Sequence, residues 1–127
     1  EPGLRPLRAR PAPRGGLISL VSRARGDAAA EAFLAKWPIA ARRAAGSALK
    51  FCLIAEGEAD VYARFDKTME WDSAAGDAVL RAAGGATLSP DGAPLAYGKA
   101  ETGYANGPFV ALGDPGAARQ LFVNPER

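Results

Sequence analysis

A carboxylate in the middle of the chain stands where it could serve a metal ion or a phosphate. Asp72 belongs to residues 71–77 (WDSAAGD), and a helix is predicted to begin at Asp72 or Ser73. The small residues that follow allow a backbone to approach a metal or a phosphate closely, and a helix N-terminus favours negative charge. The simpler interpretation is that Asp72 caps the helix and satisfies free backbone N–H groups without any ligand.

A phosphate could also be bound by Gly46, Ser47 and Lys50. Ser47 is predicted to be the N-cap of a helix over residues 48–56. Free N–H groups, the Ser47 hydroxyl and the Lys50 ammonium could then converge on one phosphate through the helix dipole, hydrogen bonds and charge. The alternative for Lys50 is an ordinary exposed helix residue, because most lysines are exposed.

Residues 60–65 (DVYARF) alternate with a period of two, which predicts a half-buried strand. Tyr62 and Arg64 share the face opposite Val61 and Phe65. Arg64 is either a solvent-facing arginine on an edge strand or a group that binds phosphate through its fork of donors.

The elements that must position these residues alternate along the chain. Strands are predicted near residues 17–22, 39–41, 60–65, 86–88, 94–97 and 109–112, and helices near residues 28–36, 48–56, 73–83 and 115–122. Asp27 is predicted to cap the first helix, and Gly84-Gly85 to end the third. Strands that alternate with helices indicate an α/β fold with a central mixed sheet and helices on its faces.

The apolar spacing also predicts which side of each helix is buried. The expected buried residues are Ala29, Ala32 and Phe33 in the first helix, Leu49, Cys52 and Leu53 in the second, and Ala75, Val79 and Ala82 or Ala83 in the third. Glu70 and Asp77, which flank the Asp72 motif, are interpreted as solvated charges.

Composition narrows the chemistry further. The chain has 127 residues, enough for one globular domain, and no histidine, which excludes His-based acid–base catalysis and His-ligated zinc. The single cysteine, Cys52, excludes an intramolecular disulfide and fits a reducing cytoplasm. Residues 1–25 hold six Arg and one Glu, and residues 1–16 are predicted to be an extended or mobile arm. Without interleaved aromatic residues, this arm does not predict nucleic-acid binding.

Two segments taken together resemble a known family. Residues 71–77 with Gly84-Gly85 are similar to the second metal-site motif of the Mg-dependent, lithium-sensitive phosphomonoesterases that include inositol monophosphatases. Residues 46–64 sharpen the resemblance to the CysQ-type 3'(2'),5'-bisphosphate nucleotidases. The resemblance implies the C-terminal half of an α/β/α sugar-phosphatase-type sandwich, a mixed sheet flanked by helices. Residues 1–16 would be a basic arm or linker and residues 17–127 the C-terminal α/β domain, with the N-terminal metal-binding domain absent.

The same resemblance assigns roles to individual residues. It implies that Asp72 is a ligand of a catalytic Mg²⁺, and that Ser47 and Lys50, next to Gly46, bind the nucleotide. Arg64 stands where inositol monophosphatases carry an acid, and its guanidinium matches the second phosphate of a bisphosphorylated nucleotide.

Residues 22–25 (SRAR) align with a family segment that usually reads SRSH and approaches the adenosine. Ser22 keeps the family's residue type, whereas Arg25 replaces a histidine and cannot reproduce a neutral imidazole's acceptor. Arg25 could stack on a base or meet a phosphate, and a basic loop without a ligand is the alternative.

The leading hypothesis is a Mg-dependent hydrolase that converts adenosine 3',5'-bisphosphate to AMP and phosphate. The resemblance implies a link to sulfate assimilation and either a cytoplasmic or a peripheral inner-membrane location. The family's upstream acidic motifs are absent, so this chain is expected to be inactive without its N-terminal partner half. The alternatives are a phosphatase of inositol phosphates and a non-catalytic nucleotide-binding or interaction fragment. An uncovered apolar surface would favour a homodimer.

Overall fold

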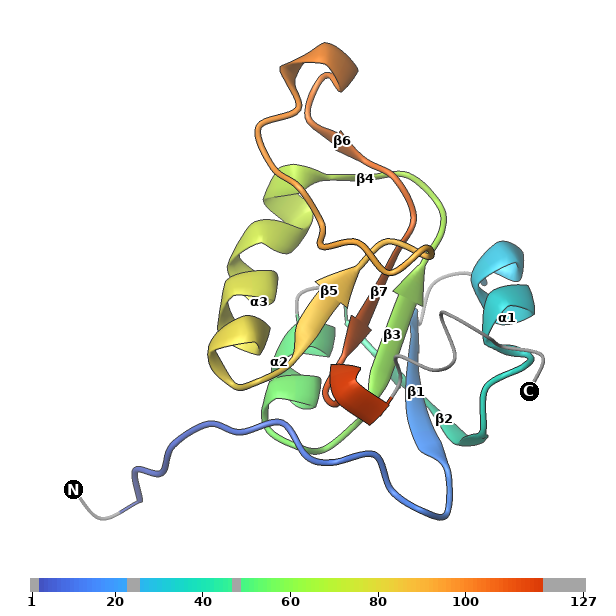
Figure 1. Cartoon of the computed structure of the whole chain (residues 1–127), viewed down its shortest axis with the longest axis vertical. Helices are drawn as coiled ribbons and strands as arrows, with labels where there is room; N and C mark the ends of the chain where they lie inside the picture. Colours follow the sequence, from blue (N-terminus) through green and yellow to red (C-terminus); the bar gives the residue numbers. More distant parts are fainter. Residues whose placement is uncertain (1–2, 23–25, 47–48, 118–127) are drawn as a thin grey trace.

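A five-stranded mixed sheet forms the centre of the molecule, as Figure 1 shows. The computed structural model describes residues 3–22, 26–46 and 49–117. The strand order is β2-β1-β3-β7-β5, and the strands are β1 (Leu17–Ser22), β2 (Ile39–Ala45), β3 (Val61–Arg64), β5 (Ala86–Leu88) and β7 (Phe109–Leu112). β1 is parallel to both β2 and β3, whereas β7 is antiparallel to both β3 and β5.

Helices cover both faces of this sheet. Helix α1 (Ala28–Leu34) packs on one face, and helices α2 (Leu49–Ala55) and α3 (Glu70–Ala82) pack on the other (Figure 1). Two hydrophobic clusters fill the spaces between the layers, one around Leu34 and Trp37, the other around Phe51 and Ile54. The α/β fold class with a mixed sheet flanked by helices is therefore confirmed.

Strand β3 lies in the interior of the sheet, between β1 and β7. Val61, Tyr62 and Ala63 are all buried. The prediction of a half-buried strand was wrong, because helices cover both faces. The interpretation of Arg64 as a solvent-facing residue on an edge strand was wrong for the same reason. The alternation itself is confirmed, since Arg64 and Tyr62 share one face and are joined by a hydrogen bond.

Helix α1 begins as predicted and buries a different side. The Asp27 carboxylate accepts a hydrogen bond from the N–H of Ala30 at 3.1 Å and caps the helix. The buried residues are Ala30 and Leu34, whereas Ala29 and Ala32 are exposed. In a helix of small alanines, the larger Leu34 and its neighbours decide which side faces the sheet.

Helix α2 buries Leu53 as predicted and leaves Cys52 half-buried, but the prediction was wrong at Leu49. Leu49 is 53% exposed, whereas Lys50 is 1% exposed and lies with Phe51 and Ile54 in the interior. The interpretation of Lys50 as an ordinary exposed lysine is therefore wrong.

Helix α3 begins at Glu70, two residues before Asp72, so Asp72 is not its N-cap. Its buried side carries Glu70, Ser73, Asp77 and Leu80, whereas the expected stripe of Ala75, Val79 and Ala82 is exposed and Ala83 is buried. Gly76 explains this orientation, because a Cβ there would lie 2.6 Å from Phe51, so only a glycine permits this contact with α2. Gly84, at φ +102°, ends the helix as predicted.

A small second sheet was not predicted. Strands β4 (Thr68–Met69) and β6 (Ala105–Asn106) pair antiparallel beside the first turn of α3, and a 3-10 turn (Ala100–Thr102) precedes β6. Asn106 is buried in β6. The strand expected over residues 94–97 is reduced to one bridge between Leu88 and Pro94. The last predicted helix is helical over residues 115–117, and its remainder lies outside the described residues.

The described part of the N-terminal arm contains no helix or strand, and its second half is bonded to the body. The Arg10 guanidinium donates to both carboxylate oxygens of Asp60, at 2.8 and 2.7 Å. The N–H of Ala9 donates to the Ala83 carbonyl at 3.0 Å, and the N–H of Ala12 donates to the Asp114 carboxylate at 2.8 Å. These bonds hold residues 9–12 along the edge of the molecule that Figure 1 shows beneath the sheet.

Candidate functional site

A cavity of about 320 Å³ lies where β3 ends and α3 begins. Aromatic residues, one cation, one carboxylate and the two aliphatic hydroxyl groups of Thr68 and Ser73 line it: Phe51, Tyr62, Arg64, Thr68, Trp71, Asp72, Ser73 and Phe109. Ligands of open α/β sheets bind beyond the carboxyl ends of parallel strands, and the end of β3 is such a place.

Arg64, the last residue of β3, is the cation of this cavity. It donates to the Tyr62 hydroxyl at 3.2 Å and forms an ion pair with Asp66. Burial alone would lower the pKa of Arg64, but the hydrogen bonds with Tyr62 and Asp66 raise it above its usual value. The guanidinium is therefore charged at any working pH, and three of its five donors are free of these two bonds.

Lys50 places a second cation beside the same wall. Its Nζ lies 4.9 Å from the centre of the Tyr62 ring, which lines the cavity. Burial, and then the positive charge of Arg64, lowers the pKa of Lys50. No carboxylate of the described residues forms an ion pair with Lys50. A buried cation without an anion is costly, so this wall of the cavity favours an anionic ligand.

Asp72 supplies the carboxylate of the cavity. Its Oδ2 accepts a hydrogen bond from the N–H of Met69 at 2.8 Å, which fastens the first turn of α3. The rest of this exposed carboxylate can bind a cation. Within residues 3–22, 26–46 and 49–117, no group of three or more His, Cys, Asp or Glu residues is placed to hold a metal ion.

The other predicted site residues lie at a distance from this constellation or cannot be placed. Ser47 and Arg25 lie outside the described residues. Ser22 ends β1 and lines a separate cavity of about 240 Å³ with Asp27 and Arg42, between α1 and the sheet. Gly46 directly follows β2, whose last residue pairs with Ser22. The structure thus brings Arg64, Asp72 and Lys50 together around one cavity and leaves Ser22 at another.

Glu70 and Asp77 are buried, so their interpretation as solvated charges was wrong. The Glu70 carboxylate pairs with the Lys99 ammonium at 2.7 Å and accepts from the N–H groups of Gly98 and Lys99; these contacts, the Lys99 hydrogen bond first, lower its pKa to about 2. The Tyr97 hydroxyl donates to Asp77 at 2.8 Å. Both carboxylates fasten the segment before β6 to α3.

Sequence analysis missed most of the cavity wall. Thr68 and Phe109 gave no signal because they reach the cavity only through pairing of β4 with β6 and of β7 with β3, and Ser73 was noted only as part of the motif. Trp71 was noted only as part of the motif, yet it is 69% exposed at the cavity.

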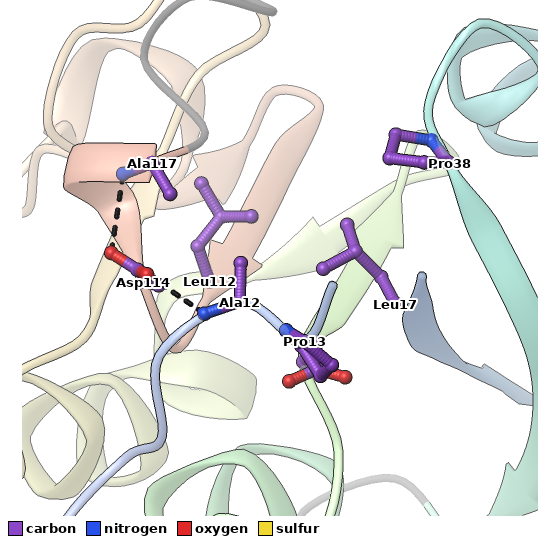
Figure 2. Close-up of a pocket in the computed structure, with 8 residues that line it drawn as sticks. Ala12, Pro13, Leu17, Pro38, Leu112, Asp114 and Ala117 are labelled. Atoms are coloured by element: carbon purple, nitrogen blue, oxygen red, sulfur yellow. Dashed lines mark hydrogen bonds between the residues drawn. The ribbon is translucent and has the colours of Figure 1, made fainter. Parts of the chain in front are cut away.

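A smaller cavity of about 100 Å³ lies at the opposite end of the sheet, near the start of β1 (Figure 2). Ala12, Pro13, Leu17, Pro38 and Leu112 make most of its wall apolar. Its two carboxylates are already bonded, Asp60 to Arg10 and the N–H of Ile18, and Asp114 to the N–H groups of Ala12 and Ala117. This cavity has neither the size nor the free polar groups of a catalytic site.

Across the described part of the chain, every helix falls short of the length and apolar character that a membrane crossing requires.

The fold and the larger cavity define an α/β protein with a polar and aromatic cavity at the carboxyl end of β3. The sequence profile of the inositol monophosphatase family matches residues 12–120. The chain therefore belongs to the inositol monophosphatase family, which confirms the resemblance and, at the level of the family, the enzyme class of phosphatases.

Individual relatives point to one branch of that family. The chain is 42% identical over 80 residues to the 3'(2'),5'-bisphosphate nucleotidase CysQ of Escherichia coli K12, covering 63% of this chain and 32% of the relative. It is 64% identical over 72 residues to an "Uncharacterized protein in pss 5'region" of Rhizobium leguminosarum bv. phaseoli, covering 54% of this chain and 76% of that protein.

A solved structure agrees with these relatives. The crystal structure of CysQ from Bacteroides thetaiotaomicron matches with a TM-score of 0.68 and 37% identity, over 80% of this chain and 38% of that chain. The chain thus spans about a third of the CysQ proteins that it matches.

Proposed function

We propose that this chain is the C-terminal part of a Mg-dependent 3'(2'),5'-bisphosphate nucleotidase that hydrolyses adenosine 3',5'-bisphosphate to AMP and phosphate. The observation that carries the proposal is the pair of cations, Arg64 and Lys50, on either side of Tyr62 next to the Asp72 carboxylate. Similarity to CysQ proteins in sequence and structure supports the choice of substrate. A role in sulfate assimilation and a cytoplasmic location belong to the same proposal.

Arg64 is the one cation among the described residues that line the cavity, and Lys50 adds its charge from beside the Tyr62 ring. Arg64 presents free guanidinium donors to the cavity, whereas Lys50 acts from behind the Tyr62 ring. A bound phosphate would give Lys50 the counter-charge that the described residues do not provide. Adenosine contacts from Ser22 and Arg25 are part of the proposal, although Ser22 lines a neighbouring cavity.

The described residues of the cavity provide one of the carboxylate ligands that a Mg²⁺ ion would need. Mg²⁺ prefers oxygen ligands and is often held by one or two carboxylates together with phosphate oxygens. Among the described residues, Asp72 is the one carboxylate that lines the cavity, so it would hold the ion together with the substrate and with carboxylates from elsewhere. A Mg²⁺ ion there would neutralise charge on the phosphoryl oxygens. Arg64 and Lys50 then orient the nucleotide, and Ser73 and Thr68 supply hydroxyls at the cavity wall.

The remaining carboxylates would come from a partner half that packs on α3. The outward side of this helix carries an apolar stripe that begins beside Asp72, formed by Trp71, Ala75, Ala78, Val79 and Ala82, all exposed. A partner on this stripe would stand next to the cavity. Alternatively, a second copy of this chain covers the stripe, which gives a homodimer.

Nucleotide binding without catalysis is a second candidate function of the chain by itself. The observation that favours it is the single carboxylate at the cavity wall, because one ligand does not make a complete Mg²⁺ site.

Titration calorimetry of this 127-residue chain with adenosine 3',5'-bisphosphate and with inositol 1-phosphate tests the proposal. The nucleotide should bind more tightly, and Arg64→Gln should remove that preference, with Arg43→Gln on the exposed edge strand as the control. Equal binding of the two ligands would favour the inositol-phosphate alternative. Phosphate release that depends on Mg²⁺ and is abolished by Asp72→Asn would show that the chain is active alone and overturn the need for a partner half.

A further inference from the structure

Thr68 lines the cavity, and Asn106 lies opposite it on the partner strand of the small sheet. Thr68 is 7% exposed and Asn106 is 5% exposed. The Asn106 amide nitrogen, Nδ2, lies 3.1 Å from Thr68 Oγ1, 3.1 Å from the Met69 carbonyl oxygen and 3.0 Å from Ser73 Oγ. One buried amide therefore contacts both of the aliphatic hydroxyls that line the cavity.

The partners of Asn106 fix which way its amide group points. A backbone carbonyl can only accept a hydrogen bond, and a lysine ammonium can only donate one. The Met69 carbonyl faces Nδ2, and the Lys99 ammonium lies 3.5 Å from Oδ1. The flipped amide would set nitrogen against ammonium and oxygen against oxygen, so the partners exclude it. Nδ2 carries two hydrogens and can only donate, so Thr68 Oγ1, one of the three oxygens that share these hydrogens, is an acceptor towards Asn106.

A hydroxyl that accepts in one direction has its single proton to donate in another. Ser73 Oγ directs its proton to the Glu70 carbonyl, at 3.3 Å. Thr68 Oγ1 donates no hydrogen bond to any described residue. Its proton is therefore available to a ligand in the cavity that Thr68 shares with Arg64.

We propose that Thr68 Oγ1 donates a hydrogen bond to a phosphate oxygen of the substrate, and that Asn106 is the positioning residue that keeps this hydroxyl turned as a donor. The proposal rests on the proposed function, because it takes a phosphorylated ligand bound beside Arg64. A phosphate oxygen only accepts hydrogen bonds and is charged, so it makes a stronger hydrogen bond with a donor hydroxyl than a neutral sugar hydroxyl does.

The test measures binding of adenosine 3',5'-bisphosphate and of inorganic phosphate to the 127-residue chain by titration calorimetry. Thr68→Val keeps the shape and removes the hydroxyl, and should weaken binding about tenfold, as expected for a lost hydrogen bond to a charged group. Thr68→Ser keeps the hydroxyl and should bind nearly as the original chain does. Melting curves by circular dichroism establish that each variant is folded, and Thr68→Ala takes the place of Thr68→Val if the latter does not fold.

Asn106→Asp tests the positioning role. Its carboxylate would accept from the Thr68 hydroxyl and turn the proton away from the cavity, so binding should weaken in the Thr68 chain. In the Thr68→Val chain the same substitution should have little further effect. A merely structural role of Asn106 would instead weaken binding equally in both chains, and that result would overturn the positioning role.

Failure of this inference can be told from failure of the proposed function. If the original chain binds the nucleotide and Thr68→Val binds it equally well, the role of Thr68 is overturned and the proposed function stands. If the chain binds inorganic phosphate but not the nucleotide, the proposed substrate is wrong, and the effect of Thr68→Val on phosphate binding decides the role of Thr68. If it binds neither, both proposals are overturned.

Discussion

The two faces of the sheet bury different kinds of residues. The α1 face is closed by an apolar cluster that includes Leu34, Trp37 and Val61. The α2 and α3 face also has an apolar cluster, but Lys50 and Asp77 are buried at its edge, each 1% exposed. Apolar burial stabilises a fold, whereas buried charge opposes it unless it is paired. Both faces therefore contribute apolar burial, and the α2 and α3 face also holds buried charged groups.

Partners on the second face explain how it tolerates those charges. Asp77 is bonded to Tyr97 at 2.8 Å and lies 3.5 Å from Arg81. Burial, the main cause, together with the Asp77 carboxylate, raises the pKa of Tyr97 to about 12, so its hydroxyl stays protonated as the donor. Lys50 has no such partner among the described residues. Lys50, whose charge is not balanced by a described carboxylate, is therefore the buried charged residue that lies beside the cavity-lining Tyr62.

The largest effect is expected on the apolar face. Trp37→Ala should lower the free energy of unfolding by about 3–5 kcal/mol, because it leaves a cavity beside Phe33 and Leu34. Urea denaturation measures this change. Trp71→Ala is the matched control, since Trp71 is 69% exposed and its removal should change the free energy by less than about 0.5 kcal/mol. Similar losses in the two variants would contradict the division between the faces.

Removal of the buried Lys50 ammonium should have the opposite effect: ligand binding weakens and stability is kept. Lys50→Met should weaken binding of adenosine 3',5'-bisphosphate about tenfold or more without lowering stability, because an apolar side chain replaces a buried charge. The lowered pKa of Lys50 means that the unfolded chain binds this proton more tightly, so its contribution to stability increases as pH rises towards 10.5. Lys50→Met should lack that increase. Lys67→Met, at an exposed position, should retain both the binding and the increase.

A cap on the α1 face should have a moderate effect. The Asp27 carboxylate accepts from the N–H of Ala30 and also from the N–H groups of Phe65 and Asp66, at 2.7 and 3.1 Å. Asp27→Ala should lower the free energy of unfolding by about 1–2 kcal/mol, measured in urea. Glu56→Ala, which removes an exposed acid, serves as the control. An unchanged urea midpoint would mean that these three donors are satisfied without Asp27.

The smallest effect is expected from the carboxylate that fastens the segment before β6 to α3. Glu70 has a pKa of about 2 against a usual 4.5, so its contribution to stability is present above pH 4.5 and is lost as pH falls towards 2. Glu70→Gln should flatten the loss of stability in this window, whereas Glu101→Gln at an exposed position should not. Denaturation midpoints between pH 2 and 6 measure the difference, and identical pH profiles of Glu70→Gln and the original chain would contradict it.

Local patterns predicted the parts of the fold that depend on near neighbours. The strand at Leu17–Ser22, the cap at Asp27 and the glycine stop after α3 follow from residues within a few positions of one another. They also predicted that Tyr62 and Arg64 share a face, because side chains alternate along any strand.

The buried faces of the helices could not be predicted in this way. Alanine is tolerated on either side of a helix, so the alanines of α1 and α3 did not indicate an orientation. In α3 the close contact between Gly76 and Phe51 and the partners of Ser73 and Asp77 decide it. Each of these contacts joins residues far apart in the sequence.

The sequence by itself determined the fold class, the family and the residues Lys50, Arg64 and Asp72 as candidates for a phosphate and metal site. Only the tertiary structure decided that Lys50 is buried without an ion pair to any described residue, and that Thr68 lines the cavity with Asn106 bonded to it. The physical reason is the distance along the sequence over which each property is decided. Residue type and spacing reveal propensity and charge, whereas burial and hydrogen-bond direction depend on which distant strands and helices come together.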